Sequence, residues 1–160
     1  MAEVAVGNFV KFTSEDTTHF RFQNFFIGET ITNESEPYDF VPFGFSGVTV
    51  NRTGDGTEAS LVLPNSTENI GKLTRSFSQD AIAGRWLAYV RVLIVDPDDK
   101  TSFTTLSNYY GQITNGTWDN VSINLALSSV LDAVGGEIPQ RKLSQALVGK
   151  LPTTTGVRLQ

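Results

Sequence analysis

Few side chains in this sequence could carry out chemistry. The 160 residues include no cysteine and a single histidine, His19. Without thiols there can be no disulfide, zinc finger, Cys-ligated iron–sulfur cluster or thiol nucleophile. One histidine still permits a Ser-His-Asp triad, but not a metal site built from several histidines. Because no G-x-S-x-G elbow is present, a structural or surface role for His19 is the favoured interpretation.

The most compact acidic cluster is Asp96, Asp98 and Asp99, directly after an apolar run. An EF-hand calcium loop starting at Asp96 would need glycine at its sixth position and glutamate at its twelfth. Those positions hold Thr101 and Ser107. Short carboxylates commonly bind local backbone amides in turns between strands. The sequence therefore favours an Asx-rich turn, with a bound cation as the alternative.

A second acidic group, Glu34, Glu36 and Asp39, lies in an expected loop. Glycosidases use two carboxylates about 5–9 Å apart, one of them with a raised pKa. Polar loop residues remain the favoured interpretation, which makes a small hydrolase the weakest hypothesis. We expect a protein with no enzymatic activity, no cofactor and no metal.

Charge is unevenly distributed along the chain. The net charge is −5, but residues 1–136 carry −8 and residues 137–160 carry +3. An acidic body argues against nucleic-acid recognition, because phosphate contacts need a basic face. No apolar run approaches 18 residues, and the first ten residues lack a signal-peptide pattern. The sequence thus predicts no membrane insertion, and a basic tail that could dock on an acidic neighbour.

Most of the chain has the pattern of β-strands. Hydroxylated, β-branched and aromatic residues are abundant, which favours strands over helices. Residues 48–63 predict a hairpin that turns at Gly54-Asp-Gly56. These glycines also match the start of a dinucleotide-binding motif, but that motif needs a helix after it, and the segment that follows here has the pattern of a strand. Residues 85–95 predict a buried strand. Residues 109–127 predict a second hairpin, which turns at Asn115-Gly116.

Two helices are expected. Ile70, Leu73 and Phe77 share one helical face, which predicts a helix at about 66–79 capped by Asn65 or Ser66. A short helix at 139–148 is also expected. The fold class is therefore mainly β, a single-domain β-sandwich or barrel with one flanking helix. Residues 1–150 would form the domain, and residues 151–160 an extended basic arm.

Three stretches carry a resemblance to a known family. Leu61-Val-Leu-Pro-Asn65 leads into the expected helix, and residues 88–98 form a strand that ends in the acidic turn. Residues 111–127 form the second hairpin and are followed by Ile138-Pro-Gln-Arg-Lys-Leu143. Together these stretches, within about residues 45–155, resemble the small tail-tip and baseplate-hub proteins of long-tailed bacteriophages, of the minor tail protein L type. Some members carry a Cys-ligated iron–sulfur cluster, which this cysteine-free chain cannot hold.

The resemblance implies a non-enzymatic virion component at the tail tip, assembled in the bacterial host cytoplasm. Copies of the chain would form a ring that joins the tail tube to the distal tip, in contact with tail-tube and tail-tip or hub proteins. The residues expected at subunit interfaces belong to the basic tail and the acidic turn: Arg141, Lys142, Lys150, Leu151, Pro152, Arg158, Asp96, Asp98 and Asp99.

A β-sandwich binding module for carbohydrate or peptide is the alternative. It would show a cluster of solvent-exposed aromatic side chains, whereas most aromatics at strand spacing belong to a core. The candidates are Phe20, Phe22, Phe40, Phe43, Phe45, Trp86, Tyr109, Tyr110 and Trp118.

Overall fold

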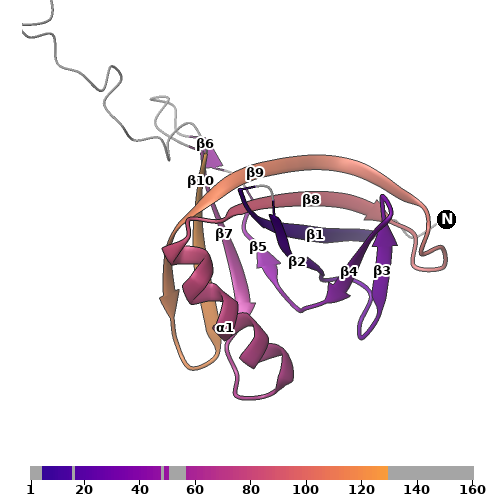
Figure 1. Cartoon of the computed structure of the whole chain (residues 1–160). Coiled ribbons are helices and arrows are strands. Elements are labelled where there is room, and N and C mark those ends of the chain that lie inside the picture. The colour runs from indigo at the N-terminus through magenta and orange to yellow at the C-terminus, as the bar shows by residue number, and fades with distance from the viewer. Residues whose placement is uncertain (1–4, 16, 48, 51–56, 130–160) are drawn as a thin grey trace, which may run out of the picture.

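The structure is a computed structural model that describes residues 5–15, 17–47, 49–50 and 57–129. These residues form ten strands and one helix (Figure 1). The elements are β1 (Ala5–Ser14), β2 (Thr17–Gln23), β3 (Thr30–Asn33), β4 (Glu36–Phe40), β5 (Gly44–Phe45), β6 (Thr49–Val50), β7 (Thr57–Pro64), α1 (Asn69–Ala83), β8 (Leu87–Val95), β9 (Phe103–Trp118) and β10 (Ser122–Ser129). The prediction of a mainly β chain with one flanking helix is confirmed.

All ten strands belong to one mixed sheet. Its order is β3-β4-β2-β1-β8-β9-β10-β7-β5, and β6 also pairs with β7. Every pair is antiparallel except β2 with β4. The end strands β3 and β5 do not pair with each other, so the sheet is open and the barrel alternative is not confirmed.

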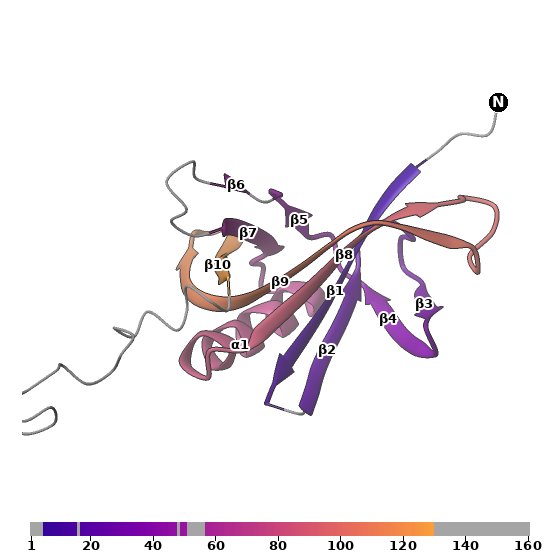
Figure 2. The same ribbon diagram turned by 90° about the horizontal axis from the view of Figure 1, so that it is seen from above.

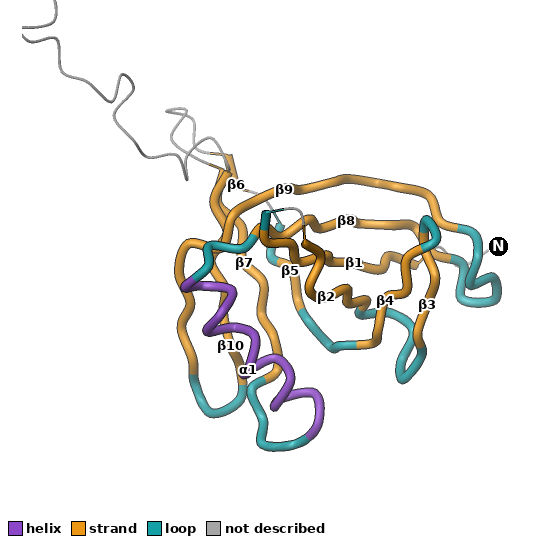
Figure 3. Tube along the Cα trace, viewed as in Figure 1, coloured by secondary structure: helices purple, strands orange, loops and turns teal. Residues whose placement is uncertain are grey.

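The long strand β9 divides the sheet into two parts. Its first residues pair with β8 and its later residues pair with β10; Gly111 lies opposite Ala88 on one side and Ser129 on the other. Figure 3 shows β9 running without interruption from the loop after β8 to the turn before β10. We call β1, β2, β8 and residues 103–110 of β9 the β1 half. The β10 half is β7, β10 and residues 111–118 of β9.

The main core fills the space between the two halves and α1. Helix α1 lies in the angle between them (Figure 2), and its Phe77 and Ala81 are buried there. Phe77 contacts the Phe12 ring from the β1 half, with ring centroids 5.2 Å apart. From the β10 half, Leu61 and Leu125 belong to the same cluster.

A second, smaller core covers the opposite face of the β1 half. Phe9 and Leu93 lie on this face and are fully buried against Tyr38 of β4 and Phe26. The buried amide of Gln23 holds the loop after β2 in place, because it accepts from the backbone amides of residues 25 and 26 and donates to two carbonyls. β1 and β8 are therefore covered on both faces over much of their length, whereas residues 104–108 of β9 are exposed.

The expected helix exists but begins later than predicted. It spans Asn69–Ala83, its N-cap is Glu68, and no side chain caps it. Asn65, one of the two predicted caps, instead accepts a hydrogen bond from Arg75 Nε (2.7 Å) and donates to the Asp119 carbonyl. A cap must lie directly before the first helical turn, and residues 65–68 are used to cross from β7 to α1.

Both predicted hairpins are found, but one turn was misplaced. Thr49 pairs with Glu58, which confirms the first hairpin; the Gly54-Asp-Gly56 turn itself lies outside the described residues. In the second hairpin, Asn115 and Gly116 are ladder residues of β9. The turn follows Asp119, whose carboxylate accepts from the amides of Val121 (2.7 Å) and Ser122 (2.6 Å).

Gly116 is needed for packing against α1, although Asn-Gly in the sequence predicted a turn. A Cβ at this position would come within 2.5 Å of Ile82 Cδ1 on α1. The glycine lets the helix approach the strand closely, so Asn-Gly here is not a turn signal. The expected helix at 139–148 and the arm at 151–160 lie outside the described residues, so the domain boundary at 150 stays a prediction.

Candidate functional site

The predicted acidic interface residues lie in the exposed turn between β8 and β9. Asp96 Oδ1 accepts a hydrogen bond from the Asp98 amide (2.9 Å). Asp99 Oδ1 accepts from the Thr101 amide (2.9 Å) and hydroxyl (2.6 Å), and these bonds, the hydroxyl first, hold the pKa of Asp99 below its usual value. The carboxylates bind their own loop, as an Asx-rich turn does.

No group of three or more acidic, histidine or cysteine side chains in the described part of the chain is arranged to hold a metal ion. The remaining predicted interface residues are those of the basic tail. They lie outside the described residues: Arg141, Lys142, Lys150, Leu151, Pro152 and Arg158.

The second acidic group is engaged in ion pairs and hydrogen bonds. Glu36 lies 2.7 Å from Lys11 Nζ and 3.3 Å from Arg21, and these contacts, Lys11 first, lower its pKa. Glu34 pairs with Arg91 at 2.8 Å, and Asp39 accepts from a threonine hydroxyl. A glycosidase acid needs a raised pKa, and the pKa of Glu36 is shifted in the opposite direction.

His19 is exposed and stacks on the indole of Trp86. The ring centroids are 4.0 Å apart and the planes are 7° from parallel. Trp86 is itself part of the main core. This contact fits the structural or surface interpretation of His19.

The aromatic candidates are mostly core residues. Phe22, Phe43, Trp86 and Tyr109 are buried, as strand spacing predicted. Tyr110 and Trp118 are exposed, at 48% and 44%, but they lie eight positions apart on β9. The exposed aromatic cluster expected of a carbohydrate or peptide module is thus not found among the described residues.

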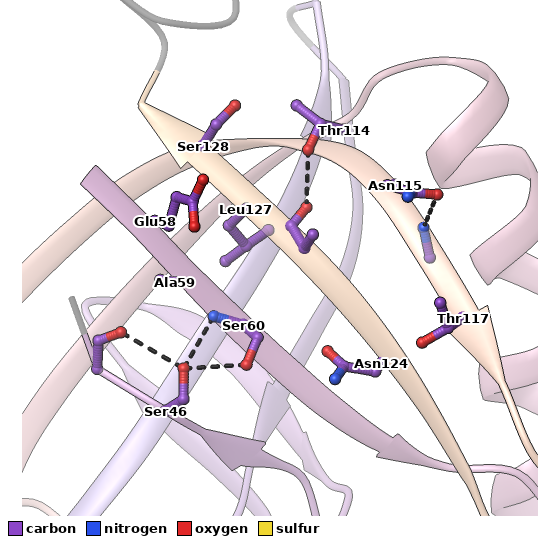
Figure 4. Close-up of a pocket in the computed structure, with 13 residues that line it drawn as sticks. Ser46, Glu58, Ala59, Ser60, Thr114, Asn115, Thr117, Asn124, Leu127 and Ser128 are labelled. Carbon is purple, nitrogen blue, oxygen red and sulfur yellow. Dashed lines mark hydrogen bonds between the residues drawn. The ribbon is translucent and has the colours of Figure 1, made fainter. Parts of the chain in front are cut away.

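The open surface of the β10 half holds a shallow hollow of about 450 Å³ (Figure 4). Three strands supply alternate side chains to it: Thr117 lies beside Asn124, and Ala126 beside Ser60. Ser46 reaches it from the segment after β5, and its hydroxyl contacts the Ser60 hydroxyl at 2.9 Å. The lining residues are Ser46, Gly47, Glu58, Ala59, Ser60, Thr114, Asn115, Gly116, Thr117, Asn124, Ala126, Leu127 and Ser128.

The chemistry of this hollow is that of hydroxyls and amides. Among its lining residues, Glu58 alone carries a titratable side chain. Such a surface can donate and accept many hydrogen bonds, and its small side chains leave it nearly flat. The sequence contained the signal for it, since polar residues alternate with Ile123, Leu125 and Leu127 in β10. A strand with alternating residues has one polar face. The alternation in β10 alone did not show that the polar faces of three neighbouring strands form one continuous surface.

A second hollow of about 480 Å³ lies where the two halves meet. Val92 and Tyr109 contribute to it from the β1 half, and Phe45 from β5. Its other lining residues are Asn8, Ser46, Gly47, Ser107 and Asn108. It opens on the same face of the β1 half that carries the main core, beyond the reach of α1.

Charged and ionisable groups gather on the opposite face of the β1 half. The guanidinium of Arg91 is only 9% exposed; it pairs with Glu34 and donates to Thr105 Oγ1 at 3.2 Å. Among the described residues, its Nε meets no hydrogen-bond partner. Burial, together with nearby Glu36, raises the pKa of Tyr38 to about 12.

Comparison with known proteins shows a likeness in fold to solved structures. No protein-family model and no curated protein matches the sequence. Among solved structures, the chain is similar to a chain of the virion of a native gene transfer agent particle, with a TM-score of 0.50 and 15% sequence identity. The match covers 82% of this chain and 42% of that chain, so this chain spans less than half the length of its structural relative. At this identity the likeness establishes a shared fold.

No helix in the described part of the chain has the length and apolar character needed to cross a bilayer.

Proposed function

We propose that this chain is a non-enzymatic structural subunit of a phage-like virion. The observation that carries the proposal is the similarity of its fold, over most of the chain, to a chain of a gene transfer agent virion. More finely, we propose a place at the tail tip or baseplate hub, in a ring that joins the tail tube to the distal tip. The finer proposal rests on the sequence resemblance to tail-tip proteins.

The open face of the β10 half supports an assembly role. It is flat and rich in small polar side chains, and charged residues are nearly absent from its hollow. The centres of protein–protein interfaces are depleted of charge. We propose this face, together with the basic tail and the acidic turn, as the surfaces that meet neighbouring subunits.

The first test is sedimentation of a lysate of the native source through a sucrose gradient, with the chain tracked by mass spectrometry. A virion subunit sediments with megadalton particles at fixed stoichiometry, and imaging of labelled particles then places it along the tail. Recovery only near the top of the gradient, at the mass of a free small protein, would overturn the proposal.

Two variants separate the proposed surfaces. Asn124→Arg puts a long charged side chain on the open face, and removal of residues 152–160 shortens the basic tail. Each should reduce incorporation into particles while the free protein keeps its unfolding midpoint. Lys72→Glu, on the exposed side of α1, is the matched control and should assemble normally. Unchanged incorporation of a variant would rule out the surface that it alters.

A further inference from the structure

The loop between β2 and β3 presents an isoleucine to solvent on a rigid frame. Ile27 is 81% exposed, more than any other large apolar side chain that the structure describes. The buried side-chain amide of Gln23 holds this loop from inside, because it accepts from two loop amides (2.8 and 2.9 Å) and donates to the carbonyls of Phe26 and Glu29. The frame keeps Ile27 away from the core and pre-arranges its side chain for contact with another molecule.

The acidic turn between β8 and β9 lies beside this loop. Lys100, at the end of the turn, forms an ion pair with Glu29 of the loop. The three aspartates of the turn are exposed, so an apolar tip is flanked by three carboxylates. We call Ile27 and these three aspartates the acidic end.

A row of two cations and two tyrosines crosses the β1 half near its other end. Arg21 lies opposite Lys11, and Lys11 lies opposite Tyr89. Tyr89 in turn lies opposite Tyr110, which is half-exposed, and the two tyrosine rings are 5.9 Å apart. Residues directly opposite in a ladder share a face of the sheet, so all four side chains lie on the face that carries Phe9. We call these four residues the cation–tyrosine row.

The cation–tyrosine row is positively charged. Lys11 and Arg21 contact the same carboxylate, that of Glu36, at 2.7 and 3.3 Å, and their side chains are 25% and 28% exposed. One carboxylate between two cations leaves a net positive charge on the row among the described residues. Tyrosine and arginine are enriched at the centres of protein–protein interfaces. The row therefore has the charge and the side-chain types to receive an acidic surface with an apolar tip.

The two surfaces lie at opposite ends of the same strands. From Tyr89 in the row, β8 continues to Val95 directly before the acidic turn, a length of about 20 Å at the rise of an extended strand. Figures 1 and 2 show the loop after β8 at one extremity of the described structure, away from the start of β8. One chain therefore cannot bring its own acidic end onto its own row. Two acidic ends would repel each other, which leaves the row of a second copy as the complementary partner.

We propose that the acidic end of one copy binds the cation–tyrosine row of the next copy, with Ile27 packed against the tyrosine pair and the aspartates facing the two cations. Such a contact is heterologous, and heterologous contacts generate closed rings or open filaments. The inference deepens the proposed ring and rests on the proposed function for its setting. Its failure in solution would leave the co-sedimentation of the chain with particles, and so the virion role, untouched.

Mixing two variants tests the contact directly. Ile27→Asp removes the apolar anchor from the acidic end, and Tyr110→Glu adds a carboxylate to the row. In sedimentation equilibrium, each variant alone should associate with itself roughly tenfold more weakly than the parent. An equimolar mixture should still form a dimer, because each variant keeps the surface that the other has lost. This dimer has no intact pair of surfaces left and should not grow further.

The parent chain and a shortened chain separate the other outcomes. The mass of the parent should rise with concentration, and added salt should weaken its association, because salt screens exposed charges. A parent that stays monomeric at millimolar concentration, or a mixture that stays monomeric while the parent associates, would overturn the proposal. Removal of residues 137–160 should leave association intact. If that removal abolishes association while the two variants retain it, the acidic turn binds the basic tail and the proposal is wrong.

Two matched variants control for the effect of added charge. Val121→Asp changes an aliphatic side chain that is 78% exposed in the turn after β9, and Trp118→Glu changes an exposed aromatic side chain on the same strand as Tyr110. Both should associate as the parent does, with the unfolding midpoint in urea unchanged in all four variants. If Tyr110→Glu lowers its midpoint, Tyr110→Thr replaces it, because threonine is well tolerated in strands. Equal loss of association in the controls would contradict the assigned contact.

Discussion

The two halves of the sheet use their faces differently. In the β1 half, Phe9 is buried on one face and Phe12 on the other. In the β10 half, Leu125 is buried while its neighbour Asn124 is exposed. A strand covered on both faces needs apolar residues at successive positions, and a strand covered on one face alternates. β1 and β8 are thus enclosed on both faces over much of their length, whereas β10 leaves one of its faces open.

The largest effects should come from truncating either face of the β1 half. Phe9→Ala and Phe12→Ala each remove a fully buried ring, so each should lower the free energy of unfolding by about 3–5 kcal/mol in urea denaturation. The near equality of the two is the informative result. A loss below about 1 kcal/mol for Phe9→Ala alone would mean that the second core is not packed in solution.

In the β10 half, neighbouring positions should differ strongly. Leu125→Ala should cost about 2–5 kcal/mol, because the side chain is fully buried in the main core. Asn124→Ala should stay within about 0.5 kcal/mol, as exposed substitutions usually do. Denaturation of the two single variants under identical conditions makes the comparison. A large loss for Asn124→Ala would show that the open face is covered in the isolated chain.

The helix that joins the halves offers a sharper test at Gly71. Helix propensity alone predicts that Gly71→Ala stabilises the protein by about 1 kcal/mol. In the structure a Cβ there would lie 2.3 Å from the Ser66 backbone nitrogen. Overpacking against backbone should reverse the sign, giving a loss of about 1–3 kcal/mol. Gly116→Ala is the milder comparison, because the atom it meets is the end of the flexible Ile82 side chain.

The smallest expected effect is a difference between two carboxylates in how their pKa responds to salt. Glu36 of β4 has a lowered pKa, chiefly through Lys11 in the β1 half. Asp119, in the turn that joins the two strands of the β10 half, has a lowered pKa through the Ser122 and Val121 amides. A carboxyl group whose pKa is lower in the folded than in the unfolded protein stabilises the fold at pH values above its unfolded pKa, which for Glu36 is about 4.5. This stabilisation is lost as the pH falls below that value and through the folded pKa. For Glu36 it should be under about 1 kcal/mol, because the ion pairs are partly exposed.

NMR titration of the two carboxyl groups at low and high salt measures the difference. Salt screens partly exposed ion pairs, so the pKa of Glu36 should rise toward its ordinary value. Backbone amides are not mobile charges, so the pKa of Asp119 should stay low. Glu36→Gln should weaken the loss of stability in acid, and equal salt sensitivity of both groups would contradict the assigned causes.

The positions of the strands could be predicted from the sequence more readily than the turns between them or the surfaces that several strands form together. Alternation in residues 123–127 and the apolar run at 85–95 identified strands correctly, because a strand's burial pattern is local. Asn115-Gly116 misled, because its glycine is required by a helix more than thirty residues earlier in the chain. The open hollow was missed for a related reason, since it combines side chains from strands that only the fold brings together.

The order of the sheet also constrains how the chain can fold during synthesis. Val10 pairs with Val90, eighty positions later, and β1 finds its other neighbour, β2, immediately. Long-range pairing of this kind is slow, because closing the intervening loop costs entropy before any contact compensates it. The β1–β2 hairpin must therefore wait, with Val10 and Phe12 uncovered, until β8 has left the ribosome. During that interval its apolar faces are open to aggregation, so yield on overexpression should depend on temperature and chaperone supply more than on final stability.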